Sequence, residues 1–145
     1  MLTFRRVEQT LFKPEPGDEH TAGNCFAACV ASILDLSLEV VPNFCALGKG
    51  EWYDAFAGWL IDRGYAPIFV EINPERPFMG AHGSESAPTY IIVSGKSPRG
   101  EWDHSTVWRS TGKVIEPWHD PHPSGEFLDG DPKDYICITP VWRGE

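Results

Sequence analysis

The sequence has no long hydrophobic run, no excess of basic residues and no dense, regular set of cysteines. Its most apolar stretches, such as residues 27–34, are far shorter than the roughly 20 residues that a membrane span requires. The first residues also lack the charged and then apolar pattern of a secretion signal. With 12 Lys and Arg against 21 Asp and Glu, the net charge of -9 disfavours nucleic acids and anionic membranes as partners. We therefore expect a soluble, cytoplasmic protein with no nucleic-acid or membrane partner.

The four cysteines have apolar or aromatic surroundings, and their spacing is not that of a secreted disulfide scaffold. At least one is therefore expected to be a free thiol. We interpret Cys29, Cys45 and Cys137 as small side chains that pack in the interior. Cys25 differs from them, because it stands at the start of a predicted helix.

The chain does have a hydrophobic fraction of 41%, including six Trp and eight Phe, which is sufficient for a packed core. Its length of 145 residues fits a single domain over residues 1–145. Residues 25–36 are rich in Ala and apolar on nearly all sides, which is typical of a buried central helix of about three turns, capped by Asn24. Residues 51–64 have apolar side chains at three- and four-residue intervals and end in Gly64, which predicts a second, amphipathic helix.

After the second helix the pattern changes to short runs of residues that favour β-strands. The predicted strands are residues 66–72, 88–94, 105–109, 113–118 and 135–141. A turn signal at residues 110–112 joins the third and fourth of these strands into a hairpin. Because the helices precede the strands along the chain, we expect an α+β fold in which the N-terminal central helix packs on an antiparallel meander.

Cys25 has the placement of a nucleophile, because free amides and the dipole at the first turn of a helix stabilise a thiolate. A thiol hydrolase also needs a base and a group that orients this base. His104 begins one strand of the predicted hairpin and Asp120 ends the other, so a tight turn places residue 104 opposite residues 118–120. We therefore predict His104 as the base and Asp120 as its partner. The register leaves His119 open as an alternative to Asp120.

The surroundings of these three residues carry a family resemblance. Gly23-Asn24-Cys25 opens the Ala-rich helix, His104 leads the strand segment HSTVW, and residues 114–121 end in Asp-Pro, with Gly125 soon after. Over about residues 20–128 the chain resembles the papain-like cysteine peptidase superfamily, and most of all the bacteriocin-leader peptidases of ABC exporters and their relatives in bacteria and phages. In that family a cysteine begins the central helix, a histidine starts a strand, and an aspartate before a proline closes the next strand. The resemblance implies a papain-like domain with a Cys-His-Asp triad.

The resemblance also implies an oxyanion hole and a substrate cleft. Peptidases of this family usually carry a glutamine some six residues before the cysteine, where its side chain helps to bind the oxyanion, but this chain has Glu19 there. We therefore expect the backbone amide of Cys25 and the side chain of Asn24 to take that role. Trp102 and Trp118, which lie close in sequence to the predicted base and its partner, are expected to line the cleft and contact the substrate.

These features predict a thiol hydrolase that cleaves a peptide, isopeptide or other amide bond through a thioester intermediate and needs no cofactor. Substrate recognition is expected at residues 76–86 and 122–128, while the sequence does not indicate the oligomeric state. An alternative function is that of an inactive papain-like binding module, such as a phage protein that acts on a host factor. A zinc site is a further alternative, although the spacing of its candidate ligands is not a standard zinc pattern. Those ligands are Cys25, Cys29, His104, His119, Asp120 and His122.

Overall fold

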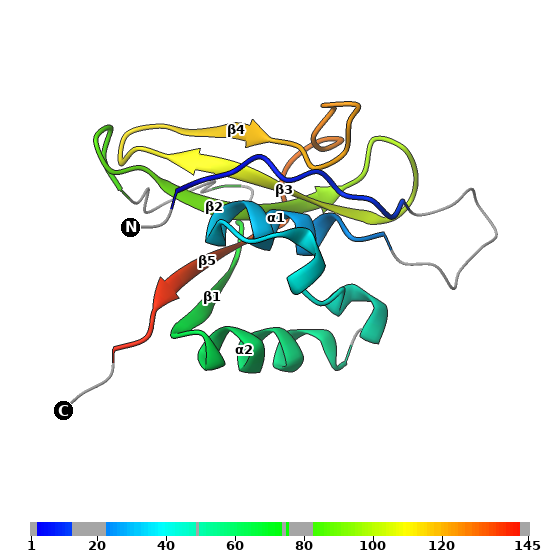
Figure 1. Cartoon of the computed structure of the whole chain (residues 1–145). Coiled ribbons are helices and arrows are strands. Elements are labelled where there is room, and N and C mark those ends of the chain that lie inside the picture. The colour runs from blue at the N-terminus through cyan, green and yellow to red at the C-terminus, as the bar shows by residue number, and fades with distance from the viewer. Residues whose placement is uncertain (1–2, 13–22, 49, 74, 76–82, 143–145) are drawn as a thin grey trace.

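Figure 1 shows the computed structural model, in which helices pack on a five-stranded antiparallel sheet. The structure describes residues 3–12, 23–48, 50–73, 75 and 83–142. Helices precede strands along the chain, so the predicted α+β fold class is confirmed. No single helix within the described ranges is long and apolar enough to cross a membrane.

The elements lie within a few residues of their predicted positions. The helices are α1 (Cys25–Leu34) and α2 (Trp52–Asp62), with two short 3-10 turns between them, η1 (Leu38–Val40) and η2 (Phe44–Leu47). The strands are β1 (Tyr65–Glu71), β2 (Thr89–Lys96), β3 (Asp103–Ser110), β4 (Ile115–His119) and β5 (Asp134–Pro140). Helix α1 packs against β2 and β3, whereas α2 packs against β1.

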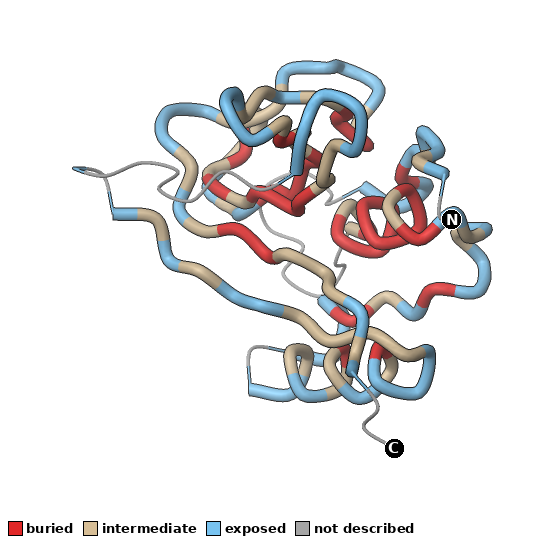
Figure 2. Tube along the Cα trace, turned by 90° about the vertical axis from the view of Figure 1, so that its left-hand side faces the viewer, coloured by how far each residue is buried: buried red, intermediate tan, exposed pale blue. Residues whose placement is uncertain are grey.

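Helix α1 is the buried centre of the domain, as its composition predicts. Nearly all of its residues after Cys25 are buried (Figure 2). Helix α1 is covered by β2 and β3 of the sheet and by the two turns η1 and η2. The helix ends at Leu34, two residues earlier than predicted. Asp35 adopts a left-handed conformation with φ of 54°, and such a residue ends a helix.

The strand order is β1-β5-β2-β3-β4, so the predicted meander is wrong. Strand β5 lies between β1 and β2 and pairs with both in antiparallel fashion. Its residues are apolar toward both faces of the sheet: Ile136 joins the core beneath α1, and Tyr135 packs with Ile91 and Val93 in a second cluster. A strand with apolar side chains on both faces suits a central position in the sheet, where its faces pack against other residues and both of its edges are paired.

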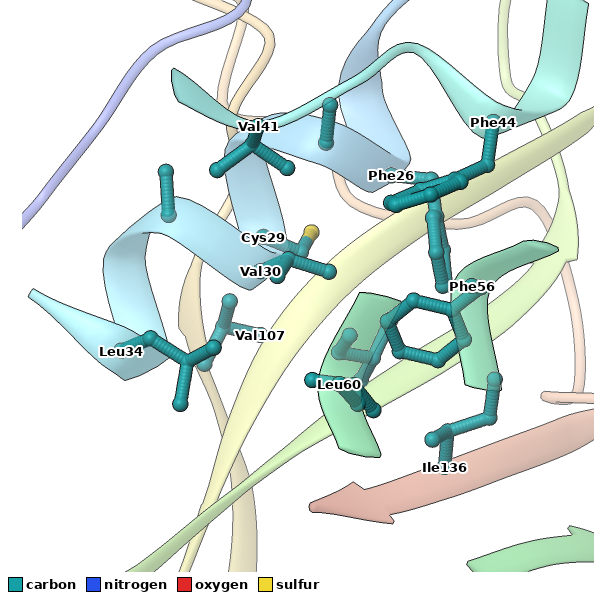
Figure 3. Packing of buried hydrophobic residues seen from close by; sticks show 13 residues of the cluster. Phe26, Cys29, Val30, Leu34, Val41, Phe44, Phe56, Leu60, Val107 and Ile136 are labelled. Carbon is teal, nitrogen blue, oxygen red and sulfur yellow. The ribbon is translucent and has the colours of Figure 1, made fainter. Parts of the chain in front are cut away.

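Three aromatic rings from three segments connect α1 to the rest of the core (Figure 3). The ring centroids of Phe26 in α1 and Phe56 in α2 are 4.9 Å apart, and Phe44 in η2 lies 5.3 Å from Phe56. Both pairs meet edge to face, an arrangement that adds to the gain from burial. Because Phe26 follows Cys25 directly, this packing fixes the start of α1, where the predicted nucleophile stands.

The N-terminal arm, residues 3–12, is extended and runs alongside α1. The Val7 amide donates to Oγ of Ser32 in α1 at 3.0 Å. The Gln9 amide donates to the carbonyl of Pro121 at 3.0 Å. Oδ1 of Asn24 accepts the amides of both Thr10 and Leu11 at 2.9 and 2.8 Å. The arm therefore joins the start of α1 to the segment that follows β4.

Candidate active site

Cys25 is the first residue of α1 and lies, half-buried, in the wall of a cleft of about 840 Å³. The first turn of a helix has N–H groups without acceptors inside the helix. No backbone carbonyl in the described residues accepts the Cys25 amide hydrogen. These amides and the helix dipole favour a negative charge at this position.

His104 lies near the start of β3, and Asp120 directly follows β4. Nε2 of His104 and Oδ1 of Asp120 are 2.7 Å apart, and the two side chains are only 3% and 1% exposed. Cys25 also interacts with His104, because its side chain helps to raise the pKa of the imidazole. Since Nε2 is taken by Asp120, Nδ1 is the ring nitrogen left for this interaction. The imidazole thus lies between the thiol and the carboxylate.

The carboxylate of Asp120 is held by the chain that follows it. Its Oδ1 also accepts the His122 amide at 3.0 Å, and its Oδ2 accepts the Phe127 amide at 2.8 Å. Both carboxylate oxygens therefore have donors in addition to the imidazole. This arrangement fixes the carboxylate in one orientation and, through it, the ring of His104.

The hairpin of β3 and β4 resolves the choice between Asp120 and His119. Nε2 of His119 is 2.7 Å from the carbonyl oxygen of Val7, and its ring meets that of Phe4, so His119 binds the N-terminal arm. The hairpin loop is longer than predicted, with Ser110 opposite Ile115, and a bulge follows in β4, where Trp118 has no partner in the register. The end of β4 is consequently shifted relative to β3, and Asp120 reaches His104 from just beyond the strand.

The pKa values of His104 and Asp120 move apart. Burial is the largest influence on His104 and lowers its pKa, but hydrogen bonds to Asp120 and Cys25 and the charges of both outweigh burial and raise this pKa to about 9. For Asp120, burial raises the pKa. The hydrogen bonds from His104 and from the Phe127 and His122 amides lower the pKa by more than burial raises it, so it lies below its ordinary value. At neutral pH the pair is therefore an imidazolium and a carboxylate.

We expect the pKa of His104 to fall when Cys25 is replaced by alanine. The substitution removes a hydrogen bond and a negative charge that favour the imidazolium, whereas the burial that disfavours it remains. A nearby opposite charge typically changes a pKa by about 1–3 units, so a fall of at least about one unit from the wild-type value of about 9 is expected. An NMR titration of the imidazole signals measures it. An unchanged pKa would mean that the thiol does not interact with His104.

The remaining cysteines differ in their surroundings. Cys29 is fully buried, as predicted, and burial raises the pKa of its thiol well above the ordinary value. Cys137 is half-buried in β5. Cys45 was predicted to be buried but is exposed and lines the same cleft as Cys25. Although the residue as a whole is exposed, packing around its sulfur, together with the charge of Cys25, raises the pKa of the Cys45 thiol to about 12.

Asn24 precedes α1 as predicted, but its side chain neither caps the helix nor lines the cleft. Besides accepting the two amides of the arm, it donates from Nδ2 to Oγ1 of Thr10 at 3.0 Å. The expected role of Asn24 in an oxyanion hole is therefore corrected, because its side chain is used to hold the arm. Glu19, the other residue considered for this position, lies outside the described residues.

Gln9, which the sequence did not indicate, lies in the wall of the cleft. It is 8% exposed, and its Nε2 donates to the carbonyl of Leu11 at 2.9 Å. The same carbonyl accepts the Asn24 amide at 3.1 Å, so the Gln9 side chain lies near the peptide that joins Gly23 to Asn24. Within the described part of the chain, Oε1 of Gln9 is buried without a hydrogen-bond partner. Gln9 therefore brings an amide group to the start of α1 from 16 residues earlier in the chain.

Of the two tryptophans that were expected to line the cleft, one does so and the other does not. Trp102 lines it. Trp118 does not: its ring lies beneath the guanidinium groups of Arg6 and Arg109, at 5.5 and 4.6 Å from the ring centre, and near Tyr90. The expectation for Trp118 is thus corrected, because the bulge in the hairpin turns this residue toward the N-terminal arm.

Of the segments expected to recognise the substrate, residues 122–128 contribute His122 to the cleft. Most of residues 76–86 lies outside the described residues. In the ranges that the structure describes, no three His, Cys, Asp or Glu side chains are placed to hold a metal ion.

The cleft thus brings together a thiol at a helix start, an imidazole, a buried carboxylate and the amide of Gln9. No protein-family model, curated protein or solved structure matches this chain.

Proposed function

We propose that this protein is a thiol hydrolase that cleaves an amide bond, in a peptide, an isopeptide or another amide, through a thioester on Cys25. One observation carries the proposal: in the wall of a cleft, the imidazole of His104 bonds a buried carboxylate through Nε2 and also interacts with the thiol at a helix start, which helps to raise the pKa of His104. A nucleophile, a base and an orienting group within hydrogen-bond reach are the requirements of nucleophilic catalysis. A papain-like domain is also supported by the order along the chain, in which a cysteine begins a helix, a histidine lies near the start of a strand and an aspartate follows the next strand.

In the first half of the reaction the thiolate of Cys25 attacks the carbonyl carbon of the substrate amide and forms a C–S bond. The negative charge that develops on the carbonyl oxygen is met by the amide of Cys25 and by Nε2 of Gln9, which donates one hydrogen to the Leu11 carbonyl and carries a second. The imidazolium of His104 then gives its Nδ1 proton to the leaving nitrogen, and the C–N bond breaks. Asp120 stays ionised and stabilises the imidazolium.

In the second half a water molecule attacks the thioester. His104, now neutral, takes a proton from this water through Nδ1 as the C–O bond forms, and the C–S bond breaks to release the acid. The thiolate and the imidazolium are thereby restored. The bond from Nε2 of His104 to Asp120 is kept throughout, so the ring returns to the same orientation.

Alkylation of the native protein tests this assignment. We expect iodoacetamide at pH 7 to modify Cys25 in preference to the other three cysteines, because the helix start and the imidazolium stabilise its thiolate. His104→Ala removes the imidazolium and is expected to slow this labelling by roughly tenfold. Mass spectrometry of the digested protein, sampled over time, gives the rate at each cysteine.

Cys137 provides an internal control, because it is half-buried and does not line the cleft that contains Cys25. Its labelling rate should be the same in the wild type and in His104→Ala. Slow labelling of Cys25, no faster than that of Cys137 and unaffected by His104, would overturn the hydrolase proposal. The alternative of a binding module without turnover would then be favoured.

A further inference from the structure

Arg99 and His122 lie together in the wall of the cleft, and neither takes part in the proposed chemistry. Ser124 connects them: its amide donates to Nδ1 of His122 at 3.0 Å, and its hydroxyl accepts from Nη1 of Arg99 at 3.0 Å. The ring centroids of His122 and His104 are 6.4 Å apart. The cleft that contains Cys25 therefore has two further donor groups, one of which, His122, lies beside His104.

The contacts of His122 determine which of its nitrogens carries a proton. Nδ1 accepts the Ser124 amide and therefore has no hydrogen. Burial, followed by the charge of Arg99, lowers the pKa of His122, so the ring is neutral at pH 7 and its hydrogen is on Nε2. No group in the described residues accepts this hydrogen. The ring is held in place by an edge contact with Phe12, at 5.2 Å between centroids.

Arg99 is carried by a loop between β2 and β3 that is fixed internally. The Ser97 amide donates to the carbonyl of Trp102 at 2.8 Å, and the Arg99 amide donates to Oγ of Ser97 at 3.1 Å. The Trp102 ring covers Gly100 so closely that a Cβ there would overlap it. The loop backbone that carries Arg99 is thus held by its own contacts, and the Arg99 side chain is only 23% exposed.

The guanidinium of Arg99 is weakly paired. Among the described residues its nearest carboxylate oxygen, on Glu126, is 3.9 Å away, whereas Lys133 and Asp103 in the same cleft pair at 2.8 Å. In a chain with a net charge of -9, a cation placed in the cleft without a close carboxylate has room for a second acidic partner. A guanidinium and a neutral N–H donor that line one cleft and are joined through Ser124 can each donate to an oxygen of a carboxylate.

We propose that Arg99 and His122 bind a carboxylate of the substrate, close to the amide bond that is cleaved. The proposal rests on the proposed function of Cys25 and adds a substrate class to it, namely amides that carry a carboxylate near the scissile bond. This carboxylate belongs either to the end of a peptide or to an acidic side chain. Both present the same two oxygens, so the experiment contains a probe for each.

Matched electrophiles that react with Cys25 test the proposal. N-iodoacetyl-glycylglycine has a terminal carboxylate, N-iodoacetyl-glycylglycinamide is its neutral counterpart, and N-iodoacetyl-aspartyl-glycinamide has a side-chain carboxylate. The rate of each with Cys25 is divided by its rate with 2-mercaptoethanol, which corrects for intrinsic reactivity. In the wild type at low salt we expect at least one carboxylate probe to react about fivefold faster than the neutral probe, as a charge-assisted hydrogen bond predicts. The faster of the two identifies the source of the carboxylate.

Substitutions assign this preference to the two residues. Arg99→Gln and His122→Phe should each bring the ratio of carboxylate to neutral probe close to one, and His122→Gln, which keeps an N–H donor, should retain part of it. Arg109→Gln is the matched control, because it removes the same charge from a residue that lies outside the cleft, against Trp118 and Glu116. We expect Arg109→Gln to keep the wild-type ratio.

A wild-type ratio near one, or the same ratio in Arg99→Gln as in Arg109→Gln, would overturn the carboxylate site. The proposed function fails in a different way, through slow and His104-independent reaction of Cys25 with iodoacetamide. Rapid labelling of Cys25 without any preference among the three probes would therefore contradict only the carboxylate site.

Discussion

Replacing Cys25 with alanine is expected to abolish amide hydrolysis and leave the fold intact. Without the thiol no thioester forms, and loss of the nucleophile in such an enzyme typically lowers the rate by about 10⁴-fold to 10⁶-fold. The side chain is half-buried at the edge of the cleft, so the change leaves no enclosed cavity in the core. Mass spectrometry of a defined peptide library incubated with each protein measures the hydrolysis, and the urea midpoint measures the fold.

Cys45 offers a matched control for this experiment, because it lines the same cleft and alanine removes the same atom. The pKa of its thiol is raised to about 12, so it is protonated at neutral pH and is a poor nucleophile. We therefore expect Cys45→Ala to retain hydrolysis. Turnover that survives in Cys25→Ala and disappears in Cys45→Ala would show that the nucleophile has been misassigned.

The parts of the site that follow from local sequence were predictable. Residues 25–34 are rich in Ala and apolar on nearly all sides, which is typical of a buried helix, and Cys25 is accordingly at a helix start. His104 and Asp120 belong to one hairpin, whose turn is recognisable in the sequence, so their proximity follows even though the predicted register was off. The place of β5 within the sheet could not be predicted in this way, because its pairing with β1 and β2 depends on contacts between residues that are far apart in the chain.

The contribution of Gln9 shows why the rest was missed. A glutamine in an N-terminal segment has no local signal of function, and its place in the cleft depends on the path of the whole N-terminal arm. That path is set by Asn24 and Ser32, each of which accepts amide hydrogens from the arm. The position of Asn24 next to Cys25 in the sequence suggested a role in catalysis. Its side chain instead hydrogen-bonds the N-terminal arm and holds it in place.

Removing the carboxylate of Asp120 is expected to have the largest effect on stability. The side chain is 1% exposed and accepts hydrogen bonds from His104 and from the amides of His122 and Phe127. Asp120→Ala leaves a buried imidazole and two amides without their acceptor. Breaking a buried charged pair by removing one partner costs about 3–5 kcal/mol. Urea unfolding at pH 6 measures the difference, and Asp120→Asn, which preserves the shape and one acceptor oxygen, should lose less.

The dependence of this difference on pH separates the ion pair from simple packing. The pKa of Asp120 is lowered in the folded state, so its stabilisation is complete above the unfolded value of about 4 and is lost as the pH falls through the folded value. The pKa of His104 is raised to about 9, so its stabilisation is complete below the unfolded value of about 6.5 and is lost as the pH rises through 9. The difference between wild type and Asp120→Asn should therefore be greatest between about pH 4 and 6.5 and decline on both sides. A difference that stays constant from pH 3 to 10 would mean that Asp120 acts through its shape and not through its charge.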